Sequence, residues 1–157
     1  MAKVVAKLKH LFRTAKSLLY RFPLNLMRLQ ELQQAIAQQR TQLDVQAHSY
    51  EAQTASTGTH SDPVALLALR VMSMEEQLRR IEQRVVPVLR LRNRLKNSGS
   101  EDERVRFYIM ELYYFEDIDM VTVMLHLYKR SIGYMRRQKR KLLEQLVEEV
   151  EKFGNSL

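Results

Sequence analysis

The chain of 157 residues contains no cysteine, no tryptophan, and only four glycines and three prolines. The absence of cysteine excludes disulfide bonds and any metal site built from thiolates. The four histidines are too scattered to form a ligand pair on one helix face, so the sequence supports neither a metal nor another cofactor. Few glycines and prolines with abundant Leu, Gln, Arg and Glu predict helix almost throughout, and therefore an all-α fold.

The chain carries a formal net charge of +8, which favours an anionic partner such as nucleic acid or a membrane surface. The charge is also segregated. Residues 129–141 contain seven basic residues and no acid, whereas residues 101–119 contain seven acids and two arginines. A basic protein without a specific anionic partner would not need this separation, so we expect the basic stretch to bind an anion.

Residues 1–22 form a basic amphipathic pattern, which predicts a helix. Lysines and arginines interrupt its apolar positions, unlike a secretory signal, and no stretch reaches the roughly 18 apolar residues of a membrane span. We therefore expect a cytoplasmic protein with no integral membrane span. Three roles for the segment remain open: it lies on a membrane surface, it contacts DNA or a polymerase, or it packs as an ordinary helix with its cations in water.

Residues 24–97 are predicted to form a helical hairpin with a flexible linker at 53–61. Apolar residues recur at coiled-coil spacing on both sides of the linker, so the two helices can pair within one chain or through a homodimer. Four basic residues near the end of the second helix either contact phosphates or form a solvated face; these are Arg90, Arg92, Arg94 and Lys96. We expect residues 97–99 to end this helix and mark the main domain boundary.

Residues 100–150 contain three successive helical patterns, and we expect residues 151–157 to form a frayed tail. Ser100 and Glu103 form a capping box at the first start, and Asp119 is an N-cap for a second helix over 120–126. The first pattern predicts one buried face, made of Val105, Tyr108, Ile109, Leu112 and Phe115. A third helix is expected from Lys129, with Ile132, Met135, Leu142 and Leu146 facing inward. This order predicts a helix-turn-helix domain.

Three groups of residues resemble the promoter-binding helix-turn-helix of bacterial sigma factors: Glu111-Leu112-Tyr113-Tyr114-Phe115-Glu116, Leu125-His126-Leu127 and Ser131-Ile132. The whole layout is similar to phage late-gene transcriptional activators of the RinA and ArpU type. In this chain His126 replaces the glycine of the turn, and Tyr128 stands where the pattern has the cap of the third helix. The resemblance implies a sequence-specific transcription regulator of a phage or prophage, acting in the cytoplasm of a bacterial host cell.

In a helix-turn-helix the second helix of the motif enters the major groove of double-stranded DNA. We expect five residues to face the groove, namely Lys129, Arg130, Gly133, Tyr134 and Arg137. Four further cations are expected to contact phosphates, namely Arg136, Lys139, Arg140 and Lys141. The acids at the preceding turn could contact host RNA polymerase, namely Glu116, Asp117 and Asp119. No histidine, serine or metal ligand accompanies the acids in a catalytic pattern, so we expect no enzyme.

Two other hypotheses compete with a regulator. A DNA-packaging component, resembling a small terminase subunit, would use the helix-turn-helix to hold DNA while its coiled-coil segments build a ring. A ring of many subunits would favour that hypothesis, and a dimer would favour the regulator. A membrane-surface scaffold, driven by residues 1–22, would bind liposomes even after Arg130 and Arg137 are replaced.

Overall fold

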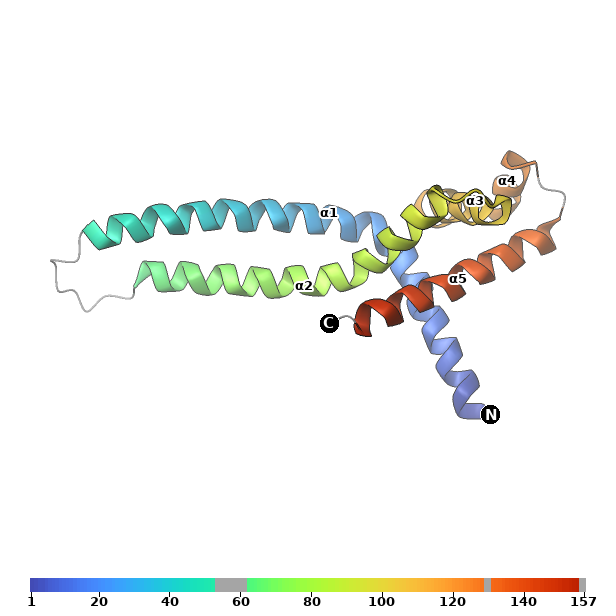
Figure 1. Ribbon diagram of the computed structural model, residues 1–157, viewed down its shortest axis with the longest axis horizontal. Coiled ribbons are helices and arrows are strands. Elements are labelled where there is room, and N and C mark those ends of the chain that lie inside the picture. The colour runs from blue at the N-terminus through green and yellow to red at the C-terminus, as the bar shows by residue number, and fades with distance from the viewer. Residues whose placement is uncertain (53–61, 129–130, 156–157) are drawn as a thin grey trace. The chain divides into compact units, whose positions relative to one another are not determined.

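The computed structural model describes residues 1–52, 62–128 and 131–155, and all secondary structure in these ranges is helical (Figure 1). The all-α prediction is therefore confirmed. The predicted linker at 53–61 lies outside the described residues. The elements are α1 (Ala2–Ala52), α2 (Pro63–Lys96), α3 (Glu101–Tyr108), the π-helix η1 (Ile109–Phe115), α4 (Met120–His126) and α5 (Ile132–Asn155).

The chain divides into two compact units, and the divisions fall inside the two long helices. Unit 1 comprises Met1–Asn25 and Gln83–Leu157, and unit 2 comprises Leu26–Glu82. We had placed the main boundary at residues 97–99. In α2 the units divide earlier, after Glu82. The reason is that the last four turns of α2 contribute fully buried side chains to unit 1, among them Val85, Val88 and Leu91.

Helix α1 continues through Pro23, where we had expected one helical segment to end and another to begin. Proline has no backbone N–H and therefore costs the helix one hydrogen bond. Apolar burial on both sides of this position offsets the loss: Leu19 and Phe22 are buried in unit 1, and Leu29 is buried in unit 2.

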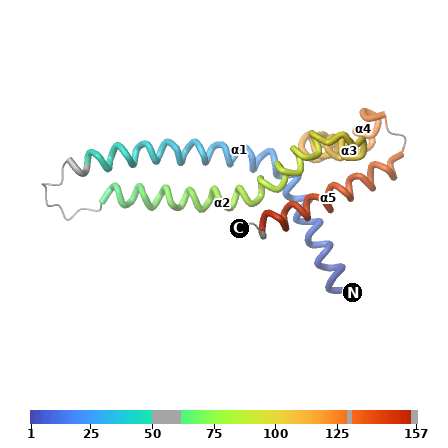
Figure 2. The backbone as a smooth tube through the Cα atoms, in the orientation of Figure 1, coloured from blue at the N-terminus to red at the C-terminus, as the bar shows by residue number. Residues whose placement is uncertain are grey.

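Unit 2 consists of residues 26–52 of α1 and residues 63–82 of α2, which lie side by side and antiparallel (Figure 2). Leu29 and Ile36 of α1, and Leu67 and Val71 of α2, are buried. An ion pair between Arg40 and Glu75 joins the two helices. The two apolar seams seen in the sequence are thus paired within one chain.

Unit 1 has a core to which α1, α2, α3, η1, α4 and α5 all contribute. Its fully buried residues include Leu19, Val88, Leu95, Ile109, Met110, Val123, Met135, Leu142 and Leu146. Two aromatic contacts dock α1 on η1. Phe22 stacks on Phe115 with ring centroids 4.8 Å apart, and Tyr20 meets Tyr114 edge-on at 4.9 Å. Residues 11–22 therefore pack as a core helix, whereas residues 1–10 are all exposed.

The buried face of residues 101–115 differs from the predicted one. Val105, Ile109, Met110 and Tyr114 are buried, whereas Tyr108, which we had placed inside, is 36% exposed. Beyond Tyr108 the chain is π-helical, with hydrogen bonds from residue i to i+5 that add a residue to the turn. The added residue brings Met110 and Tyr114 to the buried face.

The basic cluster at the end of α2 serves mainly intramolecular contacts. Arg92 forms an ion pair with Glu111 of η1, and Arg94 pairs with Glu149 of α5 at 3.1 Å. The guanidinium of Arg90 lies 5.4 Å from the ring centroid of Phe153. We had expected a frayed tail at 151–157; α5 continues to Asn155, and residues 156–157 lie outside the described residues.

We expect Leu19→Ala to destabilise unit 1 by about 2–5 kcal/mol, since Leu19 is fully buried and truncation leaves a cavity. The matched control is Leu8→Ala on the same helix, because Leu8 is 49% exposed. Denaturant unfolding of the full chain, followed by circular dichroism, measures both. Equal destabilisation by the two variants would show that α1 is not docked as described.

Candidate nucleic-acid interface

Short-range caps fix the starts of the three helical segments that lead to and form the candidate interface. Ser100 accepts a hydrogen bond from the Glu103 N–H at 3.5 Å, and Asp119 accepts one from the Thr122 N–H at 3.1 Å, as predicted. The third start was misplaced. Helix α5 begins at Ile132 rather than Lys129, and Ser131 Oγ accepts a hydrogen bond from the Tyr134 N–H at 3.2 Å.

The turn between α4 and α5 contains a non-glycine residue in the left-handed region, Tyr128, with φ of 57°. His126, which replaces the glycine of the sigma-factor pattern, lies within α4 instead. A bulky side chain at positive φ is uncommon. Tyr128 is 93% exposed, so its side chain has room despite the backbone conformation.

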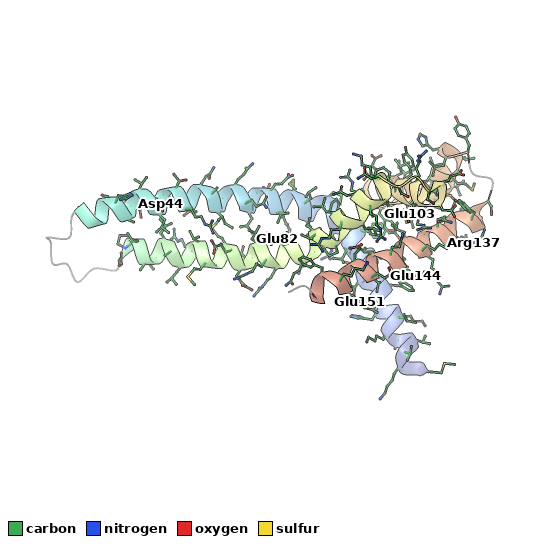
Figure 3. All side chains as sticks on the ribbon, in the orientation of Figure 1. Asp44, Glu82, Glu103, Arg137, Glu144 and Glu151 are labelled. Atoms are coloured by element: carbon green, nitrogen blue, oxygen red, sulfur yellow. The ribbon has the colours of Figure 1, made fainter. Side chains whose placement is uncertain are left out.

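The two faces of α5 differ sharply in character. Met135, Leu142 and Leu146 are fully buried, and Gln138 accepts a hydrogen bond from Arg106 Nε at 2.8 Å. The opposite surface carries four exposed cations in the first half of the helix, namely Arg136, Arg137, Arg140 and Lys141. Exposed acids follow in the second half, namely Glu144, Glu148 and Glu151; Glu144 and Glu151 are labelled in Figure 3. The first half of α5 therefore presents a positive surface.

Gly133 lies one turn before Arg137 on the outward side of α5. A Cβ atom added there would approach only Ser131 Oγ at 3.4 Å and Arg137 Nη1 at 3.7 Å. Both are ordinary van der Waals distances to side-chain atoms. Among the described residues, nothing in the packing around this position requires a glycine, although glycine weakens a helix by roughly 1 kcal/mol relative to alanine.

Two of the predicted DNA-contacting residues are turned towards the protein. The Tyr134 hydroxyl donates a hydrogen bond to Asp102 of α3, and partial burial together with this carboxylate raises the pKa of Tyr134 to about 12. Lys139 Nζ donates to the Tyr113 hydroxyl at 3.3 Å and lies 4.8 Å from that ring's centroid. Lys129 and Arg130 lie outside the described residues.

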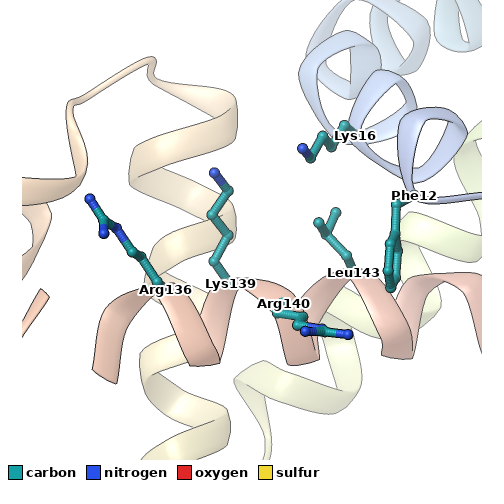
Figure 4. A pocket seen from close by; sticks show the side chains of 6 residues that line it. All are labelled: Phe12, Lys16, Arg136, Lys139, Arg140 and Leu143. Atoms are coloured by element: carbon teal, nitrogen blue, oxygen red, sulfur yellow. The ribbon is translucent and has the colours of Figure 1, made fainter. Parts of the chain in front are cut away.

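A groove of about 400 Å³ lies in unit 1 between α1 and α5 (Figure 4). Its lining residues are Phe12, Lys16, Arg136, Lys139, Arg140 and Leu143. We had assigned three of these cations to phosphate contact but had not connected Phe12 and Lys16 with them. Their i, i+4 spacing places both on one face of α1, yet it does not reveal which helix that face meets.

The pKa of the Tyr113 hydroxyl depends on the charge next to this groove. A hydrogen bond from Tyr20 lowers the pKa of Tyr113, and the nearby cations of Lys139 and Lys16 lower it further. Burial and the same contact raise the pKa of Tyr20 to about 12. Both lysine ammonium groups therefore act on one phenol.

The acids proposed to contact a polymerase have different environments. Glu116 and Asp117 are exposed between η1 and α4, and Asp117 has φ of 56°. Asp119 is also exposed, but its carboxylate is occupied as the cap of α4. Hydrogen bonds from the Thr122 hydroxyl and N–H hold its pKa below the ordinary 3.8.

A metal site and a membrane-spanning helix are both absent from the described residues. In the ranges that the structure covers, no three side chains of the metal-binding types gather into a cluster. No helix of the described residues is long and apolar enough to cross a membrane. Comparison with protein-family models, with curated proteins and with solved structures gives no match.

We expect acid to weaken the cap of α4 in the wild type. Because the folded-state pKa of Asp119 is depressed, its contribution is present above about pH 4 and is lost as the pH falls through that folded-state value. Asp119→Asn keeps an acceptor for the Thr122 N–H but does not titrate. Unfolding experiments from pH 7 to pH 2 should show a smaller loss of stability for this variant.

The control for this experiment is Asp44→Asn, which removes an exposed carboxylate from unit 2. It should retain the acid dependence of the wild type. The cap assignment fails if Asp119→Asn loses as much stability in acid as the control does.

Proposed function

We propose that the protein is a sequence-specific transcription regulator that binds double-stranded DNA by inserting α5 into the major groove. The observation that supports this most directly is the division of α5. Its first half carries exposed cations opposite a buried apolar face, and exposed acids begin only at Glu144. A helix bound by its N-terminal half needs this distribution, because phosphates flank that half.

Arg137 is the principal base-contacting residue of this proposal. It lies opposite the buried face of α5, and a guanidinium can donate two hydrogen bonds to the O6 and N7 of guanine. Gly133 precedes it by one turn on the same side and would allow the close approach of a base pair. This use accounts for a glycine that the packing of α5 does not need.

The remaining predicted contacts divide into supporting roles. Arg136, Arg140 and Lys141 hold phosphates and so fix the position of the helix without selecting sequence. Tyr134, whose hydroxyl is bound to Asp102, holds α5 against α3 and has less freedom to reach a base. Lys129 and Arg130 precede α5 and extend the positive stretch of sequence at its N-terminal end.

Arg137→Ala should lower the preference for the specific site roughly 5- to 150-fold, since a bidentate contact is worth roughly 1–3 kcal/mol of discrimination. The measurement is duplex binding by fluorescence anisotropy, using random DNA and fragments of the neighbouring genome, over a range of salt concentrations. Arg28→Ala, which removes an exposed arginine from unit 2, is the matched control.

Two outcomes would contradict the proposal. Wild-type protein could bind all duplexes equally, or Arg137→Ala could keep the sequence preference of the control. Either would remove α5 from the role of recognition helix. The packaging hypothesis would then take its place if the protein forms a ring of many subunits.

We further propose activation of phage late genes, through contact of Glu116 and Asp117 with host RNA polymerase. Both carboxylates are exposed at the turn before α4. Glu116→Gln with Asp117→Asn removes the charge, and asparagine tolerates the left-handed backbone at 117.

This double variant should reduce transcription from a promoter reporter in a bacterial host while leaving DNA affinity unchanged. Affinity is measured in parallel on the same promoter fragment. Unchanged transcription would exclude a polymerase contact at these two residues, whereas a parallel loss of DNA affinity would place them at the DNA instead.

A further inference from the structure

The groove between α1 and α5 concentrates positive charge from two helices that are distant in sequence. Of the six described residues that line it, four are cations and none is an acid. Lys16 comes from α1, and Arg136, Lys139 and Arg140 come from α5. Among the described residues, Arg140 has the carboxylate of Glu144 at 3.4 Å, on the exposed side of α5. The lining itself therefore carries positive charge without an acid.

The rest of the lining strengthens this positive potential. Leu143 lies between Lys16 and Arg140, and Phe12 adds apolar surface at the edge of the groove, as Figure 4 shows. Apolar surface displaces water and so reduces the screening of nearby charges. Repulsion between Lys16 and Lys139 is unfavourable in such a place unless an anion enters.

We propose that this groove binds phosphate groups of the DNA backbone, so that α1 is a second DNA-contacting element beside α5. This inference rests on the proposed function and extends it. The sequence left three roles possible for residues 1–22, namely membrane binding, DNA contact and packing alone. The proposal assigns them to DNA contact. Lys16 contacts the backbone at the flank of the site, together with Arg136 and Arg140, while Lys139, held by Tyr113, adds its charge to the groove.

Continuity with α5 favours a DNA backbone over a free anion. Arg136 and Arg140 line the groove and also belong to the exposed positive surface that contains Arg137. Lys9 lies two helical turns before Lys16 on the same face of α1, and all of residues 1–10 are exposed. The cations thus continue beyond the groove, which suits a polyanion with a charge every 1.7 Å or so of its axis.

The test compares Lys16→Ala with Lys7→Ala in the full chain. The two lysines are nine residues apart, so they lie on opposite faces of α1, and both are exposed. Losing one phosphate contact should reduce the slope of log affinity against log salt by about 0.9, and weaken binding roughly 5- to 10-fold at 0.1 M salt. Lys7→Ala should match the wild type. The preference between sequences should stay unchanged in both variants.

A second measurement follows the Tyr113 phenol by NMR, with and without a short duplex. Phosphate in the groove would neutralise Lys16 and Lys139, whose charges lower the pKa of Tyr113, so binding should raise that pKa. Inorganic phosphate is titrated in parallel. A rise with inorganic phosphate but not with the duplex would assign the groove to a free anion and overturn DNA as its occupant.

The outcomes separate this inference from the proposed function. If the wild type selects its site and Lys16→Ala behaves as Lys7→Ala does, the groove is not a phosphate site and α5 still binds DNA. Equal weakening by both lysine variants also overturns the inference, because it indicates general attraction. If wild-type protein binds no duplex, the proposed function fails first and this inference fails with it.

Discussion

The packing of α1 on η1 is the contact on which the rest of unit 1 depends. Phe22 stacks on Phe115 and Tyr20 meets Tyr114, and Leu19 of the same helix is fully buried in unit 1. Burial of one such side chain contributes roughly 1.5–3 kcal/mol, and an aromatic pair adds up to about 1.5 kcal/mol. The same contact sets α1 beside α5 and so creates the groove. Stability and the candidate interface therefore arise from one set of side chains.

The arginines at the end of α2 complete this arrangement from the other side. Arg92 and Arg94 are partly buried where they meet Glu111 and Glu149, which limits the exchange of these pairs with water. The arginines of α2 thus form ion pairs within unit 1, while most cations in the first half of α5 remain exposed. Sequence position alone does not separate the two uses, since both groups are dense in arginine.

Features decided by neighbouring residues could be predicted from the sequence. The caps at Ser100 and Asp119 act over three residues, and the inward positions Met135, Leu142 and Leu146 follow from helical periodicity. Contacts between distant segments could not be predicted. Phe22 and Phe115 each lie in an apolar pattern that fits several partners. Phe12 and Lys16 share one face of α1, but the sequence does not show which helix that face meets. The start of α5 was misplaced because Ser131 gives a weaker signal than the basic run around it.

The π-helix η1 also has a consequence for how the chain could vary. It contains one residue more than an α-helix with the same number of turns, and each residue of an α-helix corresponds to about 100° of rotation. Deleting one residue between Ile109 and Tyr113 would allow ordinary α geometry. If the π geometry were kept instead, each following residue would take the place of the one before it, so Tyr114 would stand where the Tyr113 hydroxyl now accepts a hydrogen bond from Lys139. The extra residue therefore sets the rotation of the helix at which Tyr114 is buried in the aromatic core while the neighbouring Tyr113 meets Lys139 of the groove.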